Sequence, residues 1–227
     1  MHQRTVLSFD DWLGLLKKKL PQLGCAKSLA FAASCCERSL PNYEAFSSEQ
    51  RWGNPEILRE ALDIVWRLIT ESTPAELKSH SIRLLKALKA VTPDTENFKS
   101  NLTSAALDAA TSVAEALDYV REGTVDHIVT ISSLAQDTIY LFVQYKENVN
   151  YSDNEFEKRI TNHPLMVGEL TKQQADVSTL ESTHALLPEF LERFRQNATD
   201  GGRSSLGISR FPRLGNPMSR VDGRTRL

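Results

Sequence analysis

The chain of 227 residues has few cysteines and no long apolar run. Its three cysteines lie within a dozen residues, an odd and clustered set that suits free thiols better than a disulfide framework. No stretch of about 18 uncharged apolar residues occurs, and the N-terminus lacks the apolar centre of a signal peptide. These absences argue against a membrane protein and predict a soluble, cytoplasmic one.

Catalytic and metal-binding motifs are also missing. There is no glycine-rich phosphate loop, zinc pattern or Ser-His-Asp constellation, and the five histidines are scattered. Glu181 and His184 have the Glu-x-x-His spacing of di-iron bundles, but that site needs a second such pair, which the sequence lacks. We expect His184 to face the core or another subunit. The sequence therefore indicates no catalytic residue, no cofactor and no metal.

Charge is divided unevenly along the chain. The last 27 residues contain six arginines and one aspartate, so the first 200 hold 21 basic and 28 acidic side chains. An acidic body is a poor surface for duplex nucleic acid, which requires clustered lysine and arginine. Half of the ten glycines follow residue 197. We predict a folded domain at 1–198 and a disordered basic tail at 199–227.

The folded part has the apolar spacing of helices throughout. We expect the first helix to end at Pro21, and the last one, from Pro164, to be kinked or split by Pro188. Asp63 and Asp108 fall on polar faces, where solvated carboxylates are expected. No strand pairs or repeats occur. The predicted fold is an all-α, single-domain bundle of seven or eight helices.

The stretch SLAFAASCCERSLPNYEAF, residues 28–46, predicts the central helix of this bundle. Small apolar residues occupy every side of its first half, which only a buried helix tolerates. Cys35 and Cys36 are expected to be small buried hydrophobes, because no neighbouring group lowers a thiol pKa. We expect Pro41 to end the helix.

Four polar residues around that expected end form the candidate ligand-binding site: Glu37, Arg38, Asn42 and Tyr43. In one interpretation they converge on a ligand beside the free carbonyls of the helix terminus. In the other, Glu37 and Arg38 pair with protein groups and Asn42 forms a turn. Buried charges are usually paired, which favours the second interpretation. A cavity lined by all four would favour the first.

The segment CCERSLPNYEAF, followed by WGNPEILREALDIVW, resembles the bacterial YjaG-like family, domain of unknown function 416. Its members carry a similar Cys-Glu-Arg, Pro-Asn-Tyr and Phe segment and then a Leu-Asp-aliphatic-aliphatic-Trp helix. The resemblance covers about residues 29–180. It implies an all-helical bacterial cytosolic protein and brings no catalytic residue with it.

Several functional hypotheses remain open. The first is a non-enzymatic protein-binding module, regulatory or toxin-neutralising like an immunity protein, whose acidic body would attract a basic partner. The second is an enzyme or small-molecule binder that uses the stretch from Glu37 to Tyr43, with Asp63 or Asp108 brought near by folding. The third is RNA contact through the tail. The heptad of Leu170, Val177, His184 and Leu191 leaves a homodimer open.

Overall fold

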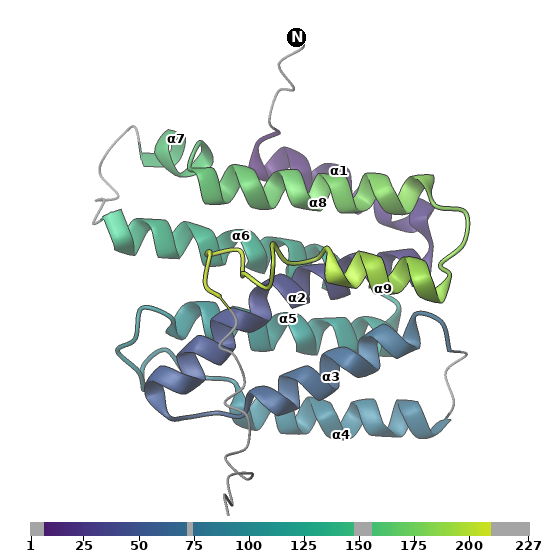
Figure 1. The fold of residues 1–227 in the computed structure, drawn as a ribbon, viewed down its shortest axis with the longest axis horizontal. Helices are drawn as coiled ribbons and strands as arrows, with labels where there is room; N and C mark the ends of the chain where they lie inside the picture. Colours follow the sequence, from purple (N-terminus) through teal and green to yellow (C-terminus); the bar gives the residue numbers. More distant parts are fainter. Residues whose placement is uncertain (1–6, 72–74, 148–155, 210–227) are drawn as a thin grey trace, which may run out of the picture.

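The computed structural model describes residues 7–71, 75–147 and 156–209. These ranges contain nine helices and no strand. The prediction of an all-α domain is confirmed (Figure 1). The helices are α1 (Phe9–Leu23), α2 (Cys25–Gln50), α3 (Pro55–Leu68), α4 (Ala75–Val91), α5 (Thr103–Glu122), α6 (Asp126–Glu147), α7 (Phe156–Thr161), α8 (Pro164–Ser182) and α9 (Pro188–Gln196). None of those helices combines the length and apolar character that crossing a bilayer requires.

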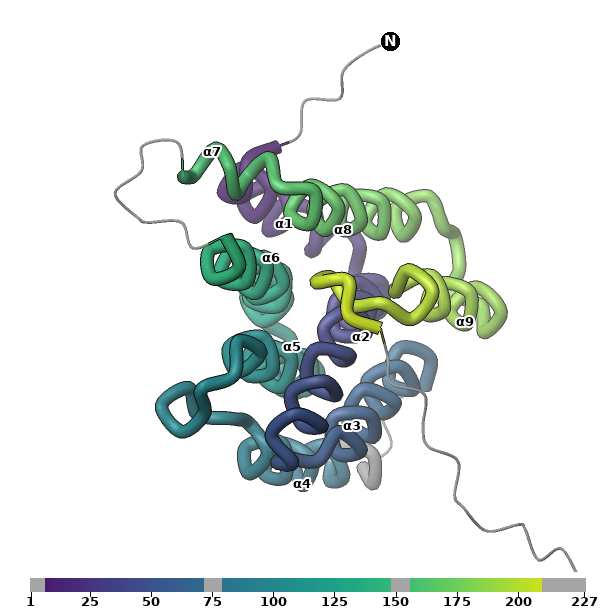
Figure 2. The backbone as a smooth tube through the Cα atoms, turned by 60° about the vertical axis from the view of Figure 1, so that its left-hand side comes forward, coloured from purple at the N-terminus to yellow at the C-terminus, as the bar shows by residue number. Residues whose placement is uncertain are grey.

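Helix α2 runs through the middle of the molecule, as its sequence predicts (Figure 2). It packs against α1, α3, α5, α6, α8 and α9, and every residue from Ser28 to Tyr43 is buried. Helices α1 and α8 lie at one edge of the bundle, and α3 and α4 lie at the opposite edge (Figure 1). A helix enclosed on all sides must have apolar or paired side chains on all sides.

The prediction that α2 ends at Pro41 is wrong, because the helix continues to Gln50. Proline has no N–H and normally breaks the interior of a helix. Here the flanking residues Tyr43 and Phe46 are fully buried, which favours keeping this segment helical. The carbonyl of Arg38 accepts a hydrogen bond from the backbone N–H of Ser205 at 3.2 Å. The candidate polar residues therefore lie along the side of a helix and not at its end.

Pro21 and Pro188 affect their helices differently. Helix α1 passes through Pro21 and ends at Leu23, where Gly24 adopts a φ of 76°. The predicted last helix is split into α8 and α9, and Pro188 occupies the first turn of α9. His184 lies exposed in the connection between them, so it is not in the core and does not share a helical face with Glu181.

The other members of the predicted heptad, Leu170, Val177 and Leu191, are buried within the chain itself. A subunit interface through this heptad is therefore not available without unfolding the domain. A homodimer stays a prediction, and the burial of these three side chains gives it no support.

The chain after α9 folds back over α2 in a series of turns up to residue 209 (Figure 1). Ala198, Ser204 and Leu206 are buried there, and isolated bridges join Arg203 to Asp200 and Ser209. The folded part thus extends beyond the boundary predicted at 198. The rest of the predicted tail, residues 210–227, lies outside the described residues.

Candidate functional site: charged networks on two sides of the central helix

Arg38 extends from α2 towards α8 and is almost completely buried. Its Nε donates to Glu169 Oε2 at 3.0 Å and its Nη2 to Glu169 Oε1 at 2.8 Å, a bidentate pair. Its Nη1 donates to Asp176 Oδ2 and to Ser34 Oγ, each at 3.0 Å. Burial lowers the pKa of the guanidinium, but Glu169 and Asp176 outweigh that effect and raise it well above its usual value. Arg38 therefore stays charged in the interior.

Further polar side chains of α8 extend the hydrogen bonding around Arg38, and groups of α1 and α6 join them. Gln173 Nε2 donates to Glu169 Oε1 at 2.9 Å, and Lys172 Nζ pairs with Asp176 Oδ1. Gln173 Oε1 accepts hydrogen bonds from Trp12 Nε1 of α1 at 2.7 Å and from Ser132 Oγ of α6 at 2.6 Å. We call these groups the Arg38 network: Trp12, Ser34, Arg38, Ser132, Glu169, Lys172, Gln173 and Asp176. Its two cations and two carboxylates cancel, and it joins four helices.

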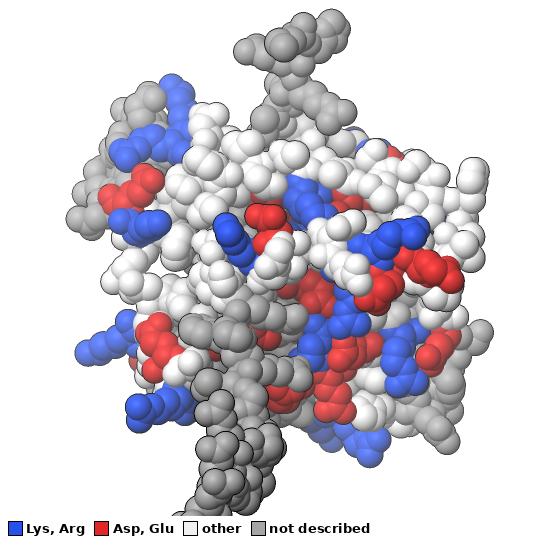
Figure 3. Space-filling model, viewed as in Figure 1, with Lys and Arg blue, Asp and Glu red and all other residues white. Residues whose placement is uncertain are grey.

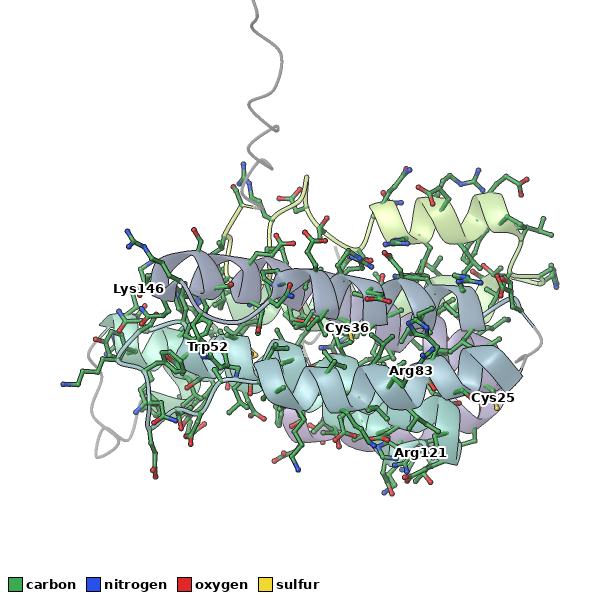
Figure 4. The ribbon with its side chains drawn as sticks, turned by 90° about the horizontal axis from the view of Figure 1, so that it is seen from below. Cys25, Cys36, Trp52, Arg83, Arg121 and Lys146 are labelled. Carbon is green, nitrogen blue, oxygen red and sulfur yellow. The ribbon has the colours of Figure 1, made fainter. Side chains whose placement is uncertain are left out.

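The cysteines beside Arg38 are inert. Cys35 and Cys36 are buried, as expected, and Figure 4 shows Cys36 inside the bundle and Cys25 at its edge. Burial raises the pKa of the Cys35 thiol to about 12 and that of Cys36 well above its usual value. Both raised pKa values favour the protonated thiol, which is a poor nucleophile compared with the thiolate.

Glu37 extends to the other side of α2, towards α3 and α9. Its carboxylate accepts two hydrogen bonds from Arg59, at 2.8 and 2.9 Å, and one from Arg195 Nε at 2.9 Å. Trp66 Nε1 donates to it at 3.0 Å. Asp63 pairs with Arg59 at 2.8 Å and also with Arg195. We call these five residues the Glu37 network.

The Glu37 network reaches the surface. Asp63, Trp66 and Arg195 border a groove of about 560 Å³ between α3 and α9. In this region Figure 3 shows basic and acidic side chains alternating over α9 and α3. Asp63 was expected to be solvated, and its side chain is 46% exposed, yet it is also joined to Glu37 through two shared arginines. The hypothesis that folding brings Asp63 close to the candidate residues agrees with this geometry.

Tyr43 and Asn42 occupy other positions along α2. The Tyr43 hydroxyl donates to the carbonyl of Val91 at 2.5 Å and accepts the N–H of Asn54 at 3.3 Å. Gly53 has a φ of 84°, and a Cβ there would lie 2.4 Å from the Tyr43 oxygen. Asn42 is fully buried, and its amide atoms have no partner among the described residues. It forms no turn, because α2 continues through it.

The four candidate residues therefore do not line one cavity. Glu37 and Arg38 take part in separate networks, and Tyr43 ties α2 to the chain around α3 and α4. Arg38 lines a groove of about 600 Å³ between α8 and residues 196–205. A ligand-binding role for these residues stays a prediction.

Sequence reasoning missed the buried polar side of α8. Glu169, Gln173 and Asp176 are spaced four and three residues apart, so they share one helical face. That spacing is visible in the sequence, but Leu170 and Val177 beside it form an apolar stripe that gives the stronger helical pattern. Asp108, expected to be solvated, is buried and accepts a hydrogen bond from Thr138 Oγ1 at 2.7 Å.

Asp108 differs from the two networks because no lysine, arginine or histidine in the described part of the chain forms an ion pair with it. Burial, with a smaller contribution from the negative charge of Asp137, raises the pKa of its carboxyl to about 6, and the hydrogen bond from Thr138 of α6 opposes this only in part. Asp108 pairs with α6 and not with the candidate residues of α2. Across the described ranges, no cluster of three histidine, cysteine or acidic side chains is arranged to hold a metal ion.

A further groove of about 690 Å³ lies between the start of α5 and the second half of α6. We call it the α5–α6 groove. Its wall contains apolar and aromatic side chains from α6 and from the loop before α5, together with polar groups. The lining residues are Phe98, Lys99, Ser100, Asn101, Ser104, Ala105, Thr138, Leu141, Phe142, Gln144 and Tyr145.

These observations define a class: an all-helical domain whose buried central helix is held by ion pairs on two sides. The chain belongs to the family described as protein of unknown function DUF416, which matches residues 15–209. The resemblance found in the sequence is thereby confirmed, and the match extends into the turns after α9.

Relatives and a solved structure agree with this assignment. The chain is 24% identical over 191 residues to the uncharacterized protein YjaG of Escherichia coli K12, covering 84% of this chain and 94% of that protein. It is 26% identical over 145 residues to an uncharacterized protein of Haemophilus influenzae, covering 63% and 72%. A crystal structure of a DUF416 family protein from Shewanella baltica OS155 matches with a TM-score of 0.75 at 24% identity, covering 85% and 97%. That likeness supports the fold, and no relative's name assigns an activity.

Proposed function

We propose that this protein is a non-enzymatic binding module that docks a partner protein in the α5–α6 groove. The observation that carries the proposal is the exposure of two large side chains on one face of α6. Leu141 is 40% exposed and Tyr145 is 65% exposed, and both line the groove. They lie four residues apart, so they are neighbours on the helix surface. Exposed apolar side chains grouped in a groove are typical of interaction sites.

The far wall of the groove is held firmly enough to serve as a docking surface. The ring of Phe98 lies 5.0 Å from that of Trp52 and 5.1 Å from that of Phe46, which is fully buried. Trp52 and Lys146 lie at the same end of the bundle (Figure 4). A wall anchored in the core loses little conformational entropy on binding, which favours affinity.

Charge at the groove favours a particular partner. Lys99 is the charged residue of its lining, and Lys146 lies over the ring of Phe142, 5.6 Å from its centroid. An apolar segment flanked by acidic residues would be complementary to this surface. The expectation of a basic partner rests on the net charge of the whole body, and the groove itself favours the opposite sign.

The internal pairing of the charged residues supports binding over catalysis. Glu37 and Arg38 are saturated by protein groups, and a catalytic group must instead be able to reach a substrate. A regulatory or toxin-neutralising role, like that of an immunity protein, fits a partner-binding module. The unpaired cysteines suit a reducing compartment, and the cytoplasm is the location that we propose.

Site-specific photo-crosslinking in the native bacterium tests the proposal. A photoreactive amino acid would replace Leu141 or Tyr145, and matched controls would carry it at Ile82 or Leu187. The controls are also large and exposed, but they lie on α4 and before α9. We expect one discrete crosslinked partner from positions 141 and 145 and none from 82 or 187. The same partner from all four positions, or none from the groove, would overturn the proposal.

A second variant pair measures the contribution of the groove. Leu141→Ser combined with Tyr145→Ala should reduce retention of the crosslinked partner at least tenfold, because aromatic and aliphatic anchors dominate interface energy. Ile82→Ser combined with Leu187→Ser should leave it unchanged. Equal loss in both double variants would point to general destabilisation, which melting curves of the two proteins would reveal.

The second candidate function is a small-molecule site at Arg38, favoured by the groove of about 600 Å³ that Arg38 and Glu169 help to line. Arg203 borders this groove, and its side chain is exposed. Arg203→Ala should abolish any anion-dependent thermal stabilisation without disturbing the Arg38 network. If phosphate or carboxylate compounds stabilise the wild type and this variant equally, the groove is not their site.

A further inference from the structure

A pocket whose lining residues all differ from those of the proposed docking groove lies between the start of α1 and helices α6, α7 and α8. We call it the Gln136 pocket. It has a volume of about 410 Å³, within the range of about 300–1,000 Å³ that small-molecule sites occupy. Its wall is built from the start of α1 and from α6, α7 and α8. The lining residues are Ser8, Phe9, Asp10, Gln136, Asp137, Tyr140, Glu157, Ile160, Thr161, Met166 and Leu170.

The wall combines apolar surface with negative charge. Ile160, Met166 and Leu170 are buried and provide an apolar part. The aromatic ring of Tyr140 also belongs to the wall, and Phe156 packs against it edge-on at 5.5 Å. Asp10, Asp137 and Glu157 add three carboxylates from three different helices, and the lining contains no lysine or arginine. A ligand with a positive charge and an apolar part would match this wall.

Gln136 provides an independent indication of a ligand. The residue is only 1% exposed, and its Nε2 donates to the carbonyl of Ser132 at 3.2 Å. Its Oε1 is buried and accepts no hydrogen bond from any described residue. Buried carbonyl oxygens are normally paired, because burial without a partner costs free energy. A donor that enters the pocket would remove this cost.

The Asp137 carboxyl is affected in a related way. Asp137 is an exposed residue, but the desolvation of its half-covered carboxyl raises the pKa of that carboxyl, and a hydrogen bond from Ser133 Oγ at 3.2 Å opposes this only in part. No lysine, arginine or histidine of the described residues pairs with it. A cation in the pocket would stabilise its ionised form, which the protein alone leaves partly uncompensated.

We propose that the Gln136 pocket binds a small primary ammonium compound with a short apolar chain. The ammonium group donates to Gln136 Oε1 and is attracted by the surrounding carboxylates, and the chain packs on Met166, Leu170 and Tyr140. This inference is independent of the partner groove, because the residues that line the two sites are different.

Titration with n-butylammonium chloride, followed by NMR of ¹³C-methyl methionine, tests the proposal in the full-length protein. The chain has three methionines, and Met166 is the one in the pocket wall. We expect a saturable shift of the Met166 methyl signal and no shift at Met1 or Met218. Uncharged n-butanol and anionic butyrate should bind at least tenfold more weakly. No shift up to 10 mM, or equal binding of n-butanol, would overturn the proposal.

Variants separate the two polar contributions. Gln136→Met keeps the volume and removes the unpaired oxygen, and Asp137→Asn keeps the shape and removes the charge. Each should weaken n-butylammonium binding at least tenfold. The control Glu71→Gln removes a carboxylate from the chain that follows α3, and it should alter binding less than twofold. Unchanged binding in both pocket variants would contradict the assignment. Tighter binding of Nα-acetyl-lysine methylamide than of n-butylammonium would assign the site to a protein lysine and exclude a free amine.

Discussion

The charged side chains on the two sides of α2 are both neutralised by ion pairs, but the pairs on the two sides differ in their exposure to water. Glu37 and Arg38 are adjacent and opposite in charge. Glu37 pairs with two arginines, and Arg38 pairs with two carboxylates. The side chains of Arg38, Glu169 and Asp176 are 6%, 2% and 3% exposed, so the three charges at the centre of the Arg38 network are buried, although Lys172 at its edge is 29% exposed. In the Glu37 network, Arg195 and Asp63 are 32% and 46% exposed. Water can therefore replace a lost partner more readily at Arg195 and Asp63 than at Arg38, Glu169 and Asp176.

This difference in exposure predicts different tolerance to substitution on the two sides of α2. A sealed pair that loses one member leaves an uncompensated charge in the interior, whereas a half-exposed pair returns its remaining member to solvent. The side of α2 that faces α8 should therefore be rigid and intolerant of substitution. The side that faces α3 and α9 should accept change, and it borders the surface groove.

The largest effect is expected from Arg38→Met. This substitution leaves Glu169 and Asp176 buried opposite an apolar side chain, which should cost about 3–5 kcal/mol of unfolding free energy. Urea denaturation measures the loss. The matched control is Arg83→Met, since Arg83 is an exposed arginine of α4 (Figure 4) and should change stability by less than about 0.5 kcal/mol. A loss below 1 kcal/mol for Arg38→Met would contradict the buried character of these charges.

An intermediate effect is expected at Asp108, a buried carboxylate without a cation. Its folded pKa of about 6 lies above its ordinary value, so the folded state binds this proton more tightly than the unfolded state. The contribution of this proton to the unfolding free energy is fully present below about pH 4, and it is lost as the pH rises through 6. Asp108→Asn should therefore stabilise the protein by about 2 kcal/mol at pH 7.5 relative to wild type, and the advantage should vanish near pH 4.

Thermal and urea unfolding between pH 4 and 8 would check this prediction. Asp118→Asn, at a residue of the same helix that pairs with Arg121, serves as the control and should show no such gain. If the unfolding free energies of the two variants change in parallel with pH, the gain cannot be attributed to the burial of Asp108 without a cation.

The smallest effect is expected from Arg195→Met. Glu37 keeps Arg59 and Trp66 as donors, and the exposed position of Arg195 gives water access, so the loss should be about 1 kcal/mol or less. Arg59→Met should cost more, because Arg59 is only 13% exposed. The comparison between the two sides of α2 would fail if Arg195→Met were as damaging as Arg38→Met under the same urea conditions.

Much of the fold could be predicted because local patterns determine it. Helical spacing indicated an all-α domain, and the apolar residues on every side of 28–36 indicated a buried central helix. Pro41 misled the prediction because a local rule competes with tertiary packing. The burial of Tyr43 and Phe46 favours continuation, and it depends on helices that lie far away in the sequence.

The partners of the candidate residues could not be predicted in the same way. Periodicity assigns a residue to a face of its helix but does not say which helix covers that face. Glu169 is 131 residues from Arg38, and Arg195 is 158 residues from Glu37. The interpretation that Glu37 and Arg38 pair with protein groups agrees with the structure, whereas the turn expected at Asn42 does not.

The distance in sequence between Arg38 and its partners also has a consequence during synthesis. The ribosome produces α2 131 residues before Glu169, a delay on the order of ten seconds at bacterial elongation rates. Throughout that interval the nascent chain carries a central helix whose guanidinium has no carboxylate to meet. The interior can close only when α8 and the turns up to Ser205 emerge. The ion pairs that neutralise Arg38 can therefore form only after more than half of the domain has been synthesised.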